Sequence, residues 1–462
     1  MRLAALLLAL SAACSAQAQT PLPPEALRTA DTLRAQALTD DTGYRIIEAL
    51  TTEIGPRLPG SEADARAVAW AQARFESLGF DRVWTEPVTF PKWERRSEHA
   101  SVLGTHAQPL VVTALGGSPG GTVEAEIVRF ADFASLDAAS PDEVAGKIVF
   151  LDFRMERTRD GSGYGAAGPV RSRGPSVAAA KGAVGFLMRS IGTSPNRVAN
   201  TGMTRFEDGV TPIPAAATSL PDADQLVRLL ERGPVQVRLA LDCGFNGEYT
   251  SQNVIAELTG REAPDEIVVI ASHLDSWDLG TGAVDDASGV GITMAAGHLI
   301  GRLPERPRRT LRVIAFANEE QGLIGARQYA ERHADTLTTT HIVGAESDFG
   351  AGRIYAFNTS AKDASHPLTR QIADALAPLE IAFAPDDGSP GPDILPLAQR
   401  GMSWAWLGQD GTHYFDLHHN ADDTLDKVDP DAVKQNVAAY SVFAYLVAES
   451  SERFPPSTTD GD

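Results

Sequence analysis

The sequence predicts an α/β fold with a mainly parallel, mixed central sheet, helices on both faces of that sheet, and an inserted β-rich domain. The chain has 462 residues, a length that favours two or three domains. After about residue 250, apolar strand candidates alternate with helix-like segments, and this alternation is typical of parallel sheets. Between residues 116 and 245, short strand candidates and one helix candidate are instead separated by Gly- and Pro-rich turns.

The first twenty residues predict a secretory signal peptide. Arg2 precedes the apolar segment 3–13, and an A-x-A motif ends at Ala18, where we expect cleavage. The apolar segment is too short to span a bilayer, although a buried N-terminal helix would give a similar pattern. Cleavage would remove Cys14 and leave Cys243 alone, so no intramolecular disulfide could form in the mature chain. We therefore expect a bacterial protein that is exported to the periplasm or secreted.

The expected domain organisation follows from these changes in composition. We assign residues 1–18 to the signal peptide, 19–115 and 246–455 to one discontinuous domain, 116–245 to the insert, and 456–462 to a disordered tail. The formal net charge of −21 disfavours nucleic-acid binding, which needs clustered Lys and Arg. No later segment has 18 consecutive apolar residues, so we expect no membrane span in the mature chain.

Individual elements can be placed in chain order. A helix should start at Ser61, with Asp64 completing a capping box, and it should end at Gly79. The strand VWTEPVTF should follow that helix, and a long amphipathic helix should cover residues 431–450. The strand candidates after residue 250 are VIAEL, EIVVIASH, LRVIAFA, HIVGAES and RIYAF.

Three of these strands are followed at once by histidine or carboxylate side chains. His273 and Asp275 follow EIVVIAS. Glu319 and Glu320 follow RVIAFA after a single residue, and Asp348 follows HIVGAES. Ligands of open α/β sheets bind at the carboxyl ends of the strands. The sequence therefore predicts that these side chains meet at one edge of the sheet.

Two loops add further candidates, namely Asp285 in GAVDDASG and His418 or His419 in YFDLHHNADDT. Each residue alone has an ordinary structural interpretation, such as turn chemistry or the start of a helix. Together, however, the acids would repel one another, and a divalent cation would remove that repulsion. Mixed histidine and carboxylate ligands favour zinc over calcium or an iron–sulfur cluster. The ligands outnumber those of one tetrahedral zinc, which indicates two ions that share a carboxylate.

The chain resembles the co-catalytic dizinc exopeptidases, a family that includes bacterial leucyl aminopeptidases and glutamate carboxypeptidase. The resemblance is carried, in chain order, by HLDSWDLGTGAVDDASG, ANEEQGLIGA, ESDFG and HHNADDT. The insert, with GKIVFL followed by AAAKGAVGFL, resembles a protease-associated domain. The resemblance covers most of the mature chain and implies a zinc-peptidase type of fold. Members of the family often dimerise, so a homodimer is compatible with it.

The resemblance also implies two Zn²⁺ ions, held by His273, Asp285, Glu320, Asp348 and His419. Asp285 would bridge the two ions, Glu319 would be the general base, and Asp275 would orient the imidazole of His273. A hydroxide that bridges the two metals would attack the scissile carbonyl, so no serine or cysteine nucleophile is needed.

Two of these assignments involve a choice between neighbours. His419 is favoured over His418 because the histidine of the family lies four residues before an Asp-Thr pair, which here begins at Asp423. Asp285 is favoured over Asp286 because the family uses the first Asp of the pair.

Substrate contacts are harder to place. The family hydrolyses dipeptides or the terminal residues of short peptides, and aminopeptidases, carboxypeptidases and dipeptidases share their metal ligands. The segment DDGSPGPDILPLAQRGMSW resembles a substrate-pocket loop, in which Asp386, Asp387 and Asp393 could bind a free α-amino group or form a solvated turn. Tyr414 could donate to the oxyanion, or it could be a packed aromatic.

Two other functions are compatible with parts of the sequence. One is a one-zinc enzyme of the same fold, such as a glutaminyl cyclase or an amide deacylase, and the complete set of five ligands disfavours it. The other is a metal-free receptor, which Glu319 beside Glu320 disfavours. A G-x-S-x-G match around Ser118 contains proline and suits a turn better than a nucleophile elbow.

Overall fold

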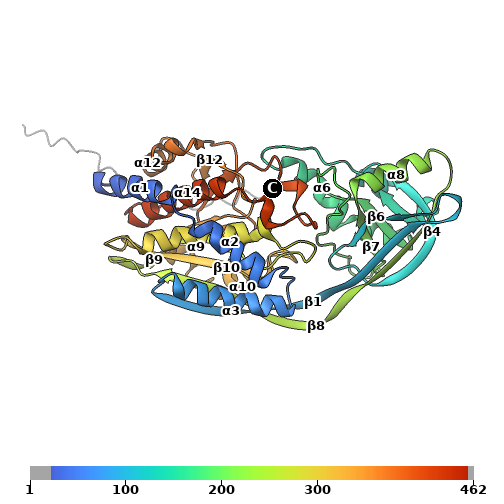
Figure 1. Ribbon diagram of the computed structural model, residues 1–462, viewed down its shortest axis with the longest axis horizontal. Helices are drawn as coiled ribbons and strands as arrows, with labels where there is room; N and C mark the ends of the chain where they lie inside the picture. The colour runs from blue at the N-terminus through green and yellow to red at the C-terminus, as the bar shows by residue number, and fades with distance from the viewer. Residues whose placement is uncertain (1–21, 456–462) are drawn as a thin grey trace, which may run out of the picture.

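The computed structural model describes residues 22–455, so the predicted signal peptide at 1–18 and the predicted tail at 456–462 lie outside it. The described chain forms a large lobe and a small lobe, the latter built from residues 103–235 (Figure 1). Two long antiparallel strands, β1 (Arg82–Val102) and β8 (Gln236–Leu258), run through both lobes and join them. Through this pair the strands of the two lobes form one sheet.

The large lobe contains the central sheet that the sequence predicts. Its strand order is β13 (Ala382–Phe383), β12 (Ile354–Thr359), β14 (Trp404–Gln409), β11 (His341–Glu346), β9 (Ala263–His273), β10 (Arg309–Phe316) and β8. The central strands β14, β11, β9 and β10 are mutually parallel, whereas β12 and β8 pair antiparallel with their neighbours. The prediction of a mainly parallel, mixed sheet is therefore confirmed.

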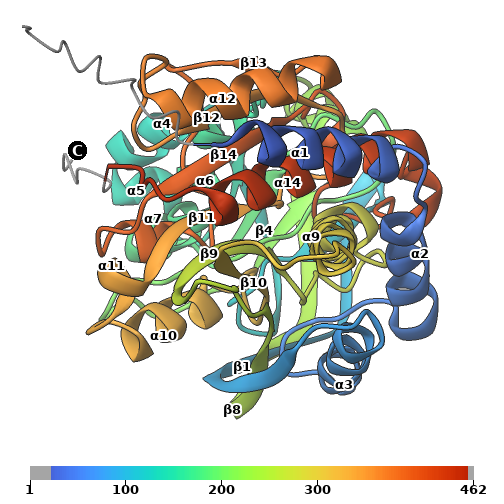
Figure 2. The ribbon, with the colours of Figure 1, turned by 90° about the vertical axis from the view of Figure 1, so that its left-hand side faces the viewer.

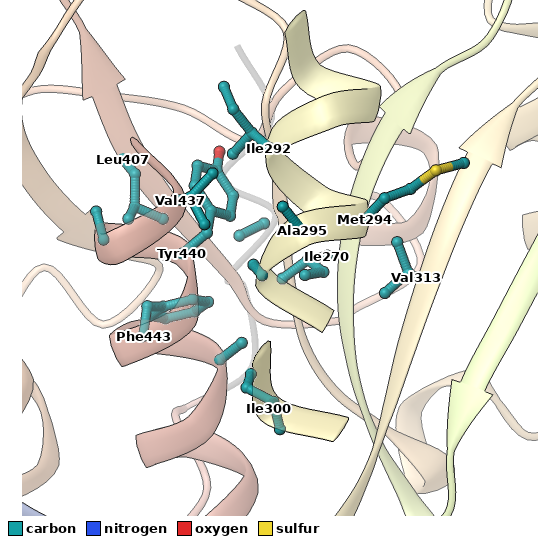
Figure 3. Close-up of a cluster of buried hydrophobic side chains, with 14 of the residues drawn as sticks. Ile270, Ile292, Met294, Ala295, Ile300, Val313, Leu407, Val437, Tyr440 and Phe443 are labelled. Atoms are coloured by element: carbon teal, nitrogen blue, oxygen red, sulfur yellow. The ribbon is translucent and has the colours of Figure 1, made fainter. Parts of the chain in front are cut away.

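Helices cover both faces of this sheet because the buried strands are apolar on both sides. On β9, Val268 and Ile270 pack against α9 (Ser288–Gly301) and α14 (Pro430–Glu449). The alternate residues Val269 and Ala271 face the other way, toward α10 (Ile324–Arg332) and α13 (Leu395–Ala398). Figure 2 shows the strands between these two helix layers, and Figure 3 shows the side chains of α9 and α14 that fill the first interface. Each large aliphatic side chain buried there contributes roughly 1.5–3 kcal/mol.

The remaining helices of the large lobe extend these layers. Helix α1 (Pro24–Ala37) packs on α14, and α2 (Thr42–Ala49) packs on α9. The others are α3 (Glu62–Ser77), α11 (Leu337–Thr340) and α12 (Pro367–Leu376). Ser61 caps α3 as predicted, by accepting from the N–H of Asp64 at 3.1 Å. The carboxylate of Asp64 instead accepts from Gly60, one residue earlier than a capping box requires.

The small lobe has its own set of parallel strands and more helix than the sequence predicts. Strands β4 (Gly121–Phe130), β5 (Ile148–Leu151), β6 (Gly185–Arg189) and β7 (Ala215–Thr218) are parallel. The short strands β2 (Gln108–Leu110) and β3 (Val112–Ala114) pair with β1 and β7, so this sheet starts before residue 116. Five helices accompany the strands: α4 (Phe133–Ala138), α5 (Pro141–Val144), α6 (Ser162–Ser172), α7 (Gly174–Ala180) and α8 (Leu220–Leu230).

Only one helix was expected in this segment, and the physical reason for the difference is local. Helices α4 and α5 are too short to show a helical period, and α6 contains three glycines and a proline. Helix α8 is amphipathic and capped by Ser219, so its sequence did carry a helical signal. Across residues 22–455, no helix combines the length and the apolar character needed to cross a membrane.

Candidate metal centre

The carboxyl ends of three parallel strands bring together the residues predicted from the sequence. His273 is the last residue of β9, and it lies opposite Phe316, the last residue of β10. Glu319 and Glu320 follow Phe316 closely, and Asp348 lies just beyond the end of β11. Because β9, β10 and β11 are parallel, these ends share one edge of the sheet.

Asp285 lies between two imidazole rings. Its Oδ1 atom is 3.1 Å from Nε2 of His273, and its Oδ2 atom is 3.3 Å from Nε2 of His419. Nε2 of His273 is also 3.3 Å from Oδ1 of Asp348. Nε2 of His419 is 2.9 Å from Oε2 of Glu320. The five side chains therefore form two groups that share one carboxylate.

The two adjacent histidines are not equivalent. Their rings stack with centroids 3.4 Å apart. Nε2 of His418 is 3.7 Å from Oδ2 of Asp285, which is the only carboxylate that it approaches within the described chain. His419 has a φ of 61°, in the left-handed region, and its ring contacts both Asp285 and Glu320. This geometry favours His419 as the ligand.

The donor atoms of this site fit a metal ion. His273, Asp285 and Glu320 place ligand atoms within 4.8 Å of one another, and so do Asp285, His418 and His419. Among the described residues, Oδ2 of Asp285 and Oε1 of Glu320 are buried without a hydrogen-bond partner. Burial raises the pKa of Glu320 to about 7, and the neighbouring Asp285 carboxylate adds to this rise. A divalent cation would supply the missing partner, and zinc accepts this mixture of nitrogen and oxygen donors.

Asp275 and Asp286 hold the surrounding backbone. The carboxylate of Asp286 accepts from the N–H of His273 at 3.1 Å. The carboxylate of Asp275 accepts from the N–H groups of Glu319 and Glu320, at 3.1 and 3.2 Å. The carbonyl oxygen of Asp275 is 3.0 Å from Nδ1 of His273, whereas its carboxylate is 3.8 Å away. Asp275 therefore contacts the imidazole through its main chain and fixes the two glutamates through its side chain.

Two buried residues that sequence reasoning missed hold the loops of the site. Arg57 is fully buried and donates to the carbonyl oxygens of Leu274 and Thr281, both at 2.7 Å, and of Gly282 at 3.0 Å. Asp423 accepts from the N–H groups of Val284 and Asp285, at 2.6 and 3.2 Å.

Arg57 thereby ties the end of β9 to the turn that carries Asp285, and Asp423 fixes that turn from the histidine loop. The sequence signal was weak in both cases. Arg57 is a single cation in the loop IGPRLPGS, and Asp423 served only to mark the Asp-Thr pair.

A cleft of about 350 Å³ lies beside the candidate metal ligands. Its wall includes Glu319 and Tyr414 as well as ligands of the candidate centre. The ring of Tyr414 packs against Phe349 and His418, with centroids 4.8 and 5.1 Å apart. Tyr414 is thus both a packed aromatic and a residue of the cleft wall.

The acids of the predicted pocket loop occupy different environments. Asp386 and Asp387 are exposed and lie outside the cleft wall, so the expectation that Asp387 faces the substrate is not supported by its position. Asp393 is fully buried, and its two carboxylate oxygens have no hydrogen-bond partner within residues 22–455. Its N–H donates to Oε2 of Glu346 at 2.8 Å. Glu346 lines the cleft, and burial raises its pKa to about 8. Sequence reasoning missed Glu346, although it lies two residues before Asp348.

The small lobe forms part of the same site. Its helix α6 contributes Tyr164 and Arg171 to the cleft wall, and Figure 1 shows α6 where the two lobes meet. Thr201 donates its N–H to the carbonyl of His419 at 2.9 Å, and the carbonyl oxygen of Thr201 is 3.3 Å from Nδ1 of that ring. The sequence placed no site residue between 116 and 245, because no histidine-and-acid cluster occurs there.

Comparison with known proteins defines the class. A family model described as peptidase family M28 matches residues 253–444. Carboxypeptidase Q of Xenopus laevis is 33% identical over 416 residues, which cover 89% of this chain and 87% of that protein. Carboxypeptidase Q of Homo sapiens is 31% identical over 418 residues, with coverages of 90% and 87%.

Solved structures agree with these matches. A peptidase M28 precursor from Shewanella amazonensis is 48% identical, with a TM-score of 0.91 and coverages of 94% and 98%. An aminopeptidase from Aneurinibacillus sp. strain AM-1 shares the fold, with 23% identity, a TM-score of 0.63 and coverages of 91% and 97%. Fold and site together define a metallo-exopeptidase. The chain belongs to peptidase family M28, and the predicted resemblance to zinc exopeptidases is confirmed.

Proposed function

We propose that this protein is an exported exopeptidase that uses two zinc ions to hydrolyse dipeptides or the terminal residues of short peptides. The observation that supports it most is the position of Asp285, whose two oxygens face the imidazoles of His273 and His419 separately. His273 and Asp348 would hold one ion, Glu320 and His419 would hold the other, and Asp285 would be shared. Bound zinc would polarise the scissile carbonyl and lower the pKa of the attacking water.

Glu319 is the general base in this proposal. It lines the cleft beside Glu320, and Asp275 fixes its backbone N–H. A carboxylate at this position can accept a proton from the attacking water and return it to the leaving amine, which must depart protonated. Tyr414, also in the cleft wall, is the candidate donor to the oxyanion.

The free α-amino group of a substrate has a candidate partner in the large lobe. Glu346 lines the cleft, and it accepts from the backbone N–H of Asp393, whose own carboxylate is fully buried and is not part of the cleft wall. An ammonium group in the cleft would compensate the Glu346 carboxylate directly, and Asp393 only from a greater distance, because opposite charges at short range favour the ionised forms.

Export is proposed from the N-terminal residues alone, namely Arg2, the apolar segment and the A-x-A motif at Ala18. The relative from Shewanella amazonensis is described as a precursor, which agrees with this proposal.

One experiment tests the metal centre and the base together. In Glu319→Gln we expect the zinc content to equal that of the wild type, while hydrolysis of a dipeptide falls by about 10²–10⁴. In Asp285→Ala we expect zinc to be lost, because both groups of ligands share this residue. Zinc is measured by elemental mass spectrometry after dialysis, and hydrolysis by release of the free amino acid.

Asp387→Asn is the matched control, since it also replaces a carboxylate by an amide but lies on the exposed turn outside the cleft. Full activity of Glu319→Gln would show that Glu319 is not the general base. A wild-type chain that retains one zinc would favour the one-zinc alternative, and a chain that retains none would favour a receptor.

A further inference from the structure

A second cavity lies where β1 and β8 pass from one lobe to the other (Figure 1). Its volume is about 660 Å³, against about 350 Å³ for the cleft, and no described residue lines both. The small lobe contributes residues 117–120 and 203–206 to its wall, and the large lobe contributes Gln321 and Ile324. A cavity of this size is in the range of small-molecule binding sites.

The wall of this second cavity is mostly apolar. Its larger side chains include Met203, Phe206, Phe245 and Ile324, which are accompanied by prolines and glycines. Phe245, on β8, is 56% exposed, the highest value among the exposed large hydrophobic side chains of residues 22–455. An apolar side chain of this size that stays in contact with solvent favours an occupant with an apolar body, because burial of such surface stabilises a complex.

Two hydrogen-bond donors belong to the same wall, one from each lobe. The guanidinium of Arg205 lies so close to Gly322 that a Cβ atom there would collide with it. Gln321 directly precedes Gly322, and it is 5% exposed. Its Nε2 atom is buried and has no hydrogen-bond partner in the described part of the chain. A buried donor without an acceptor is costly, so an oxygen atom of a ligand would stabilise this arrangement.

The charge of the second cavity is opposite to that of the cleft. Arg205 is the one charged residue in the described part of its wall, which contains no Asp or Glu. Six acids line the cleft, and the whole chain has a formal net charge of −21. An anionic oxygen would therefore be favoured at Arg205, since guanidinium–carboxylate hydrogen bonds are strong. An ammonium group would find no carboxylate in this wall.

We propose that this second cavity binds a small amphipathic carboxylate, such as a medium-chain fatty acid. The carboxylate accepts from Arg205 and Gln321, and the apolar chain packs against Met203 and Phe245. A free amino acid binds less well, because its ammonium group has no acid to pair with there. The occupant contacts Gln321, which directly follows the candidate metal ligand Glu320. The binding does not require the proposed peptidase function, so either can fail without the other.

The test uses zinc-loaded protein and calorimetry with decanoate below its micellar concentration, and 2-aminodecanoate is the matched zwitterion. The wild type should bind decanoate about tenfold more tightly than 2-aminodecanoate, since the ammonium group would be desolvated without a partner. Arg205→Gln should weaken decanoate binding by about 10–100-fold, because a hydrogen bond to a charged group is lost. Phe245→Ala should weaken it by about fivefold through lost apolar contact.

Arg400→Gln is the matched control, since it removes the same charge from an exposed position that lines neither cavity. A wild-type chain that binds no decanoate, or that binds 2-aminodecanoate as tightly, overturns the proposal even if Arg205→Gln does not fold. Decanoate binding that is equal in Arg205→Gln and the wild type places the ligand elsewhere and also overturns it.

Sedimentation velocity tests a different occupant of the same cavity, namely a second copy of the chain. A wild-type dimer that dissociates in Phe245→Ala, together with no binding of decanoate, would show that the second copy covers the cavity and would overturn the proposal. A wild-type chain whose sedimentation is unchanged in Phe245→Ala, and which binds decanoate, supports it.

Discussion

Arg57 should contribute more to the stability of the site than any single exposed charge. Its side chain is fully buried and makes four hydrogen bonds, to the carbonyls of Gly55, Leu274, Thr281 and Gly282 at 2.7–3.0 Å. Three of these acceptors lie on segments more than 200 residues away in the chain. Arg57→Met would fill a similar volume but leave these carbonyls without the guanidinium.

The expected loss can be worked from these contacts. At about 1 kcal/mol for each hydrogen bond, four bonds amount to about 4 kcal/mol. Removing the cation would also leave the nearby buried carboxylate of Asp423 less compensated. The desolvation of the guanidinium opposes these terms, and burial lowers the pKa of Arg57 for that reason. We expect a net fall of about 3–5 kcal/mol in the free energy of unfolding, as found when one partner of a buried charge network is removed.

Urea unfolding of the metal-free protein measures this change without a contribution from zinc binding. Arg57→Lys should lose about half as much, because one ammonium cannot reach all four carbonyls. Arg66→Met on α3 is the control, since Arg66 is exposed, and its effect should stay within about 0.5 kcal/mol. An Arg57→Met variant as stable as Arg66→Met would show that the four contacts do not stabilise the loops.

Two further predictions concern acid stability and maturation. Burial, together with the positive charge of Arg312, lowers the pKa of His341 to about 3. The folded state therefore keeps this ring neutral, whereas the unfolded chain takes up a proton below about pH 6.5. The free energy of unfolding should therefore fall by about 1.4 kcal/mol per pH unit below that value because of this group. In urea unfolding, the free energy of His341→Gln should depend less steeply on pH than that of the wild type. Equal slopes in the two proteins would mean that His341 does not contribute. The second prediction is that the chain recovered from the periplasm or medium of an expressing bacterium begins just after Ala18. Intact-mass measurement checks this. A full-length chain retained in the cytoplasm would contradict export.

The candidate metal centre could be predicted because its ligands obey a local rule. His273 ends the apolar strand β9, Glu320 and Asp348 come shortly after the ends of β10 and β11, and parallel strands end at one edge of a sheet. Arg57 obeys no such rule, since its partners lie in loops far along the chain. Arg171 was missed for a related reason, because α6 is interrupted by glycines and a proline that mask its helical period. Strand ends thus predict His273, Glu320 and Asp348, whereas the choice of Asp285 and His419 within their loops came from the resemblance to a known family.

The small lobe is fastened to the large lobe beside the candidate metal centre. Arg157 donates to both carboxylate oxygens of Asp416, at 2.8 and 2.6 Å, just before the histidine loop. The N–H of Thr201 donates a hydrogen bond to the carbonyl of His419 in that loop. Strands β1 and β8 also run from one lobe into the other (Figure 1). The small-lobe wall of the cleft is thus connected to the large lobe by a strand pair, a salt bridge and a hydrogen bond to a candidate metal ligand.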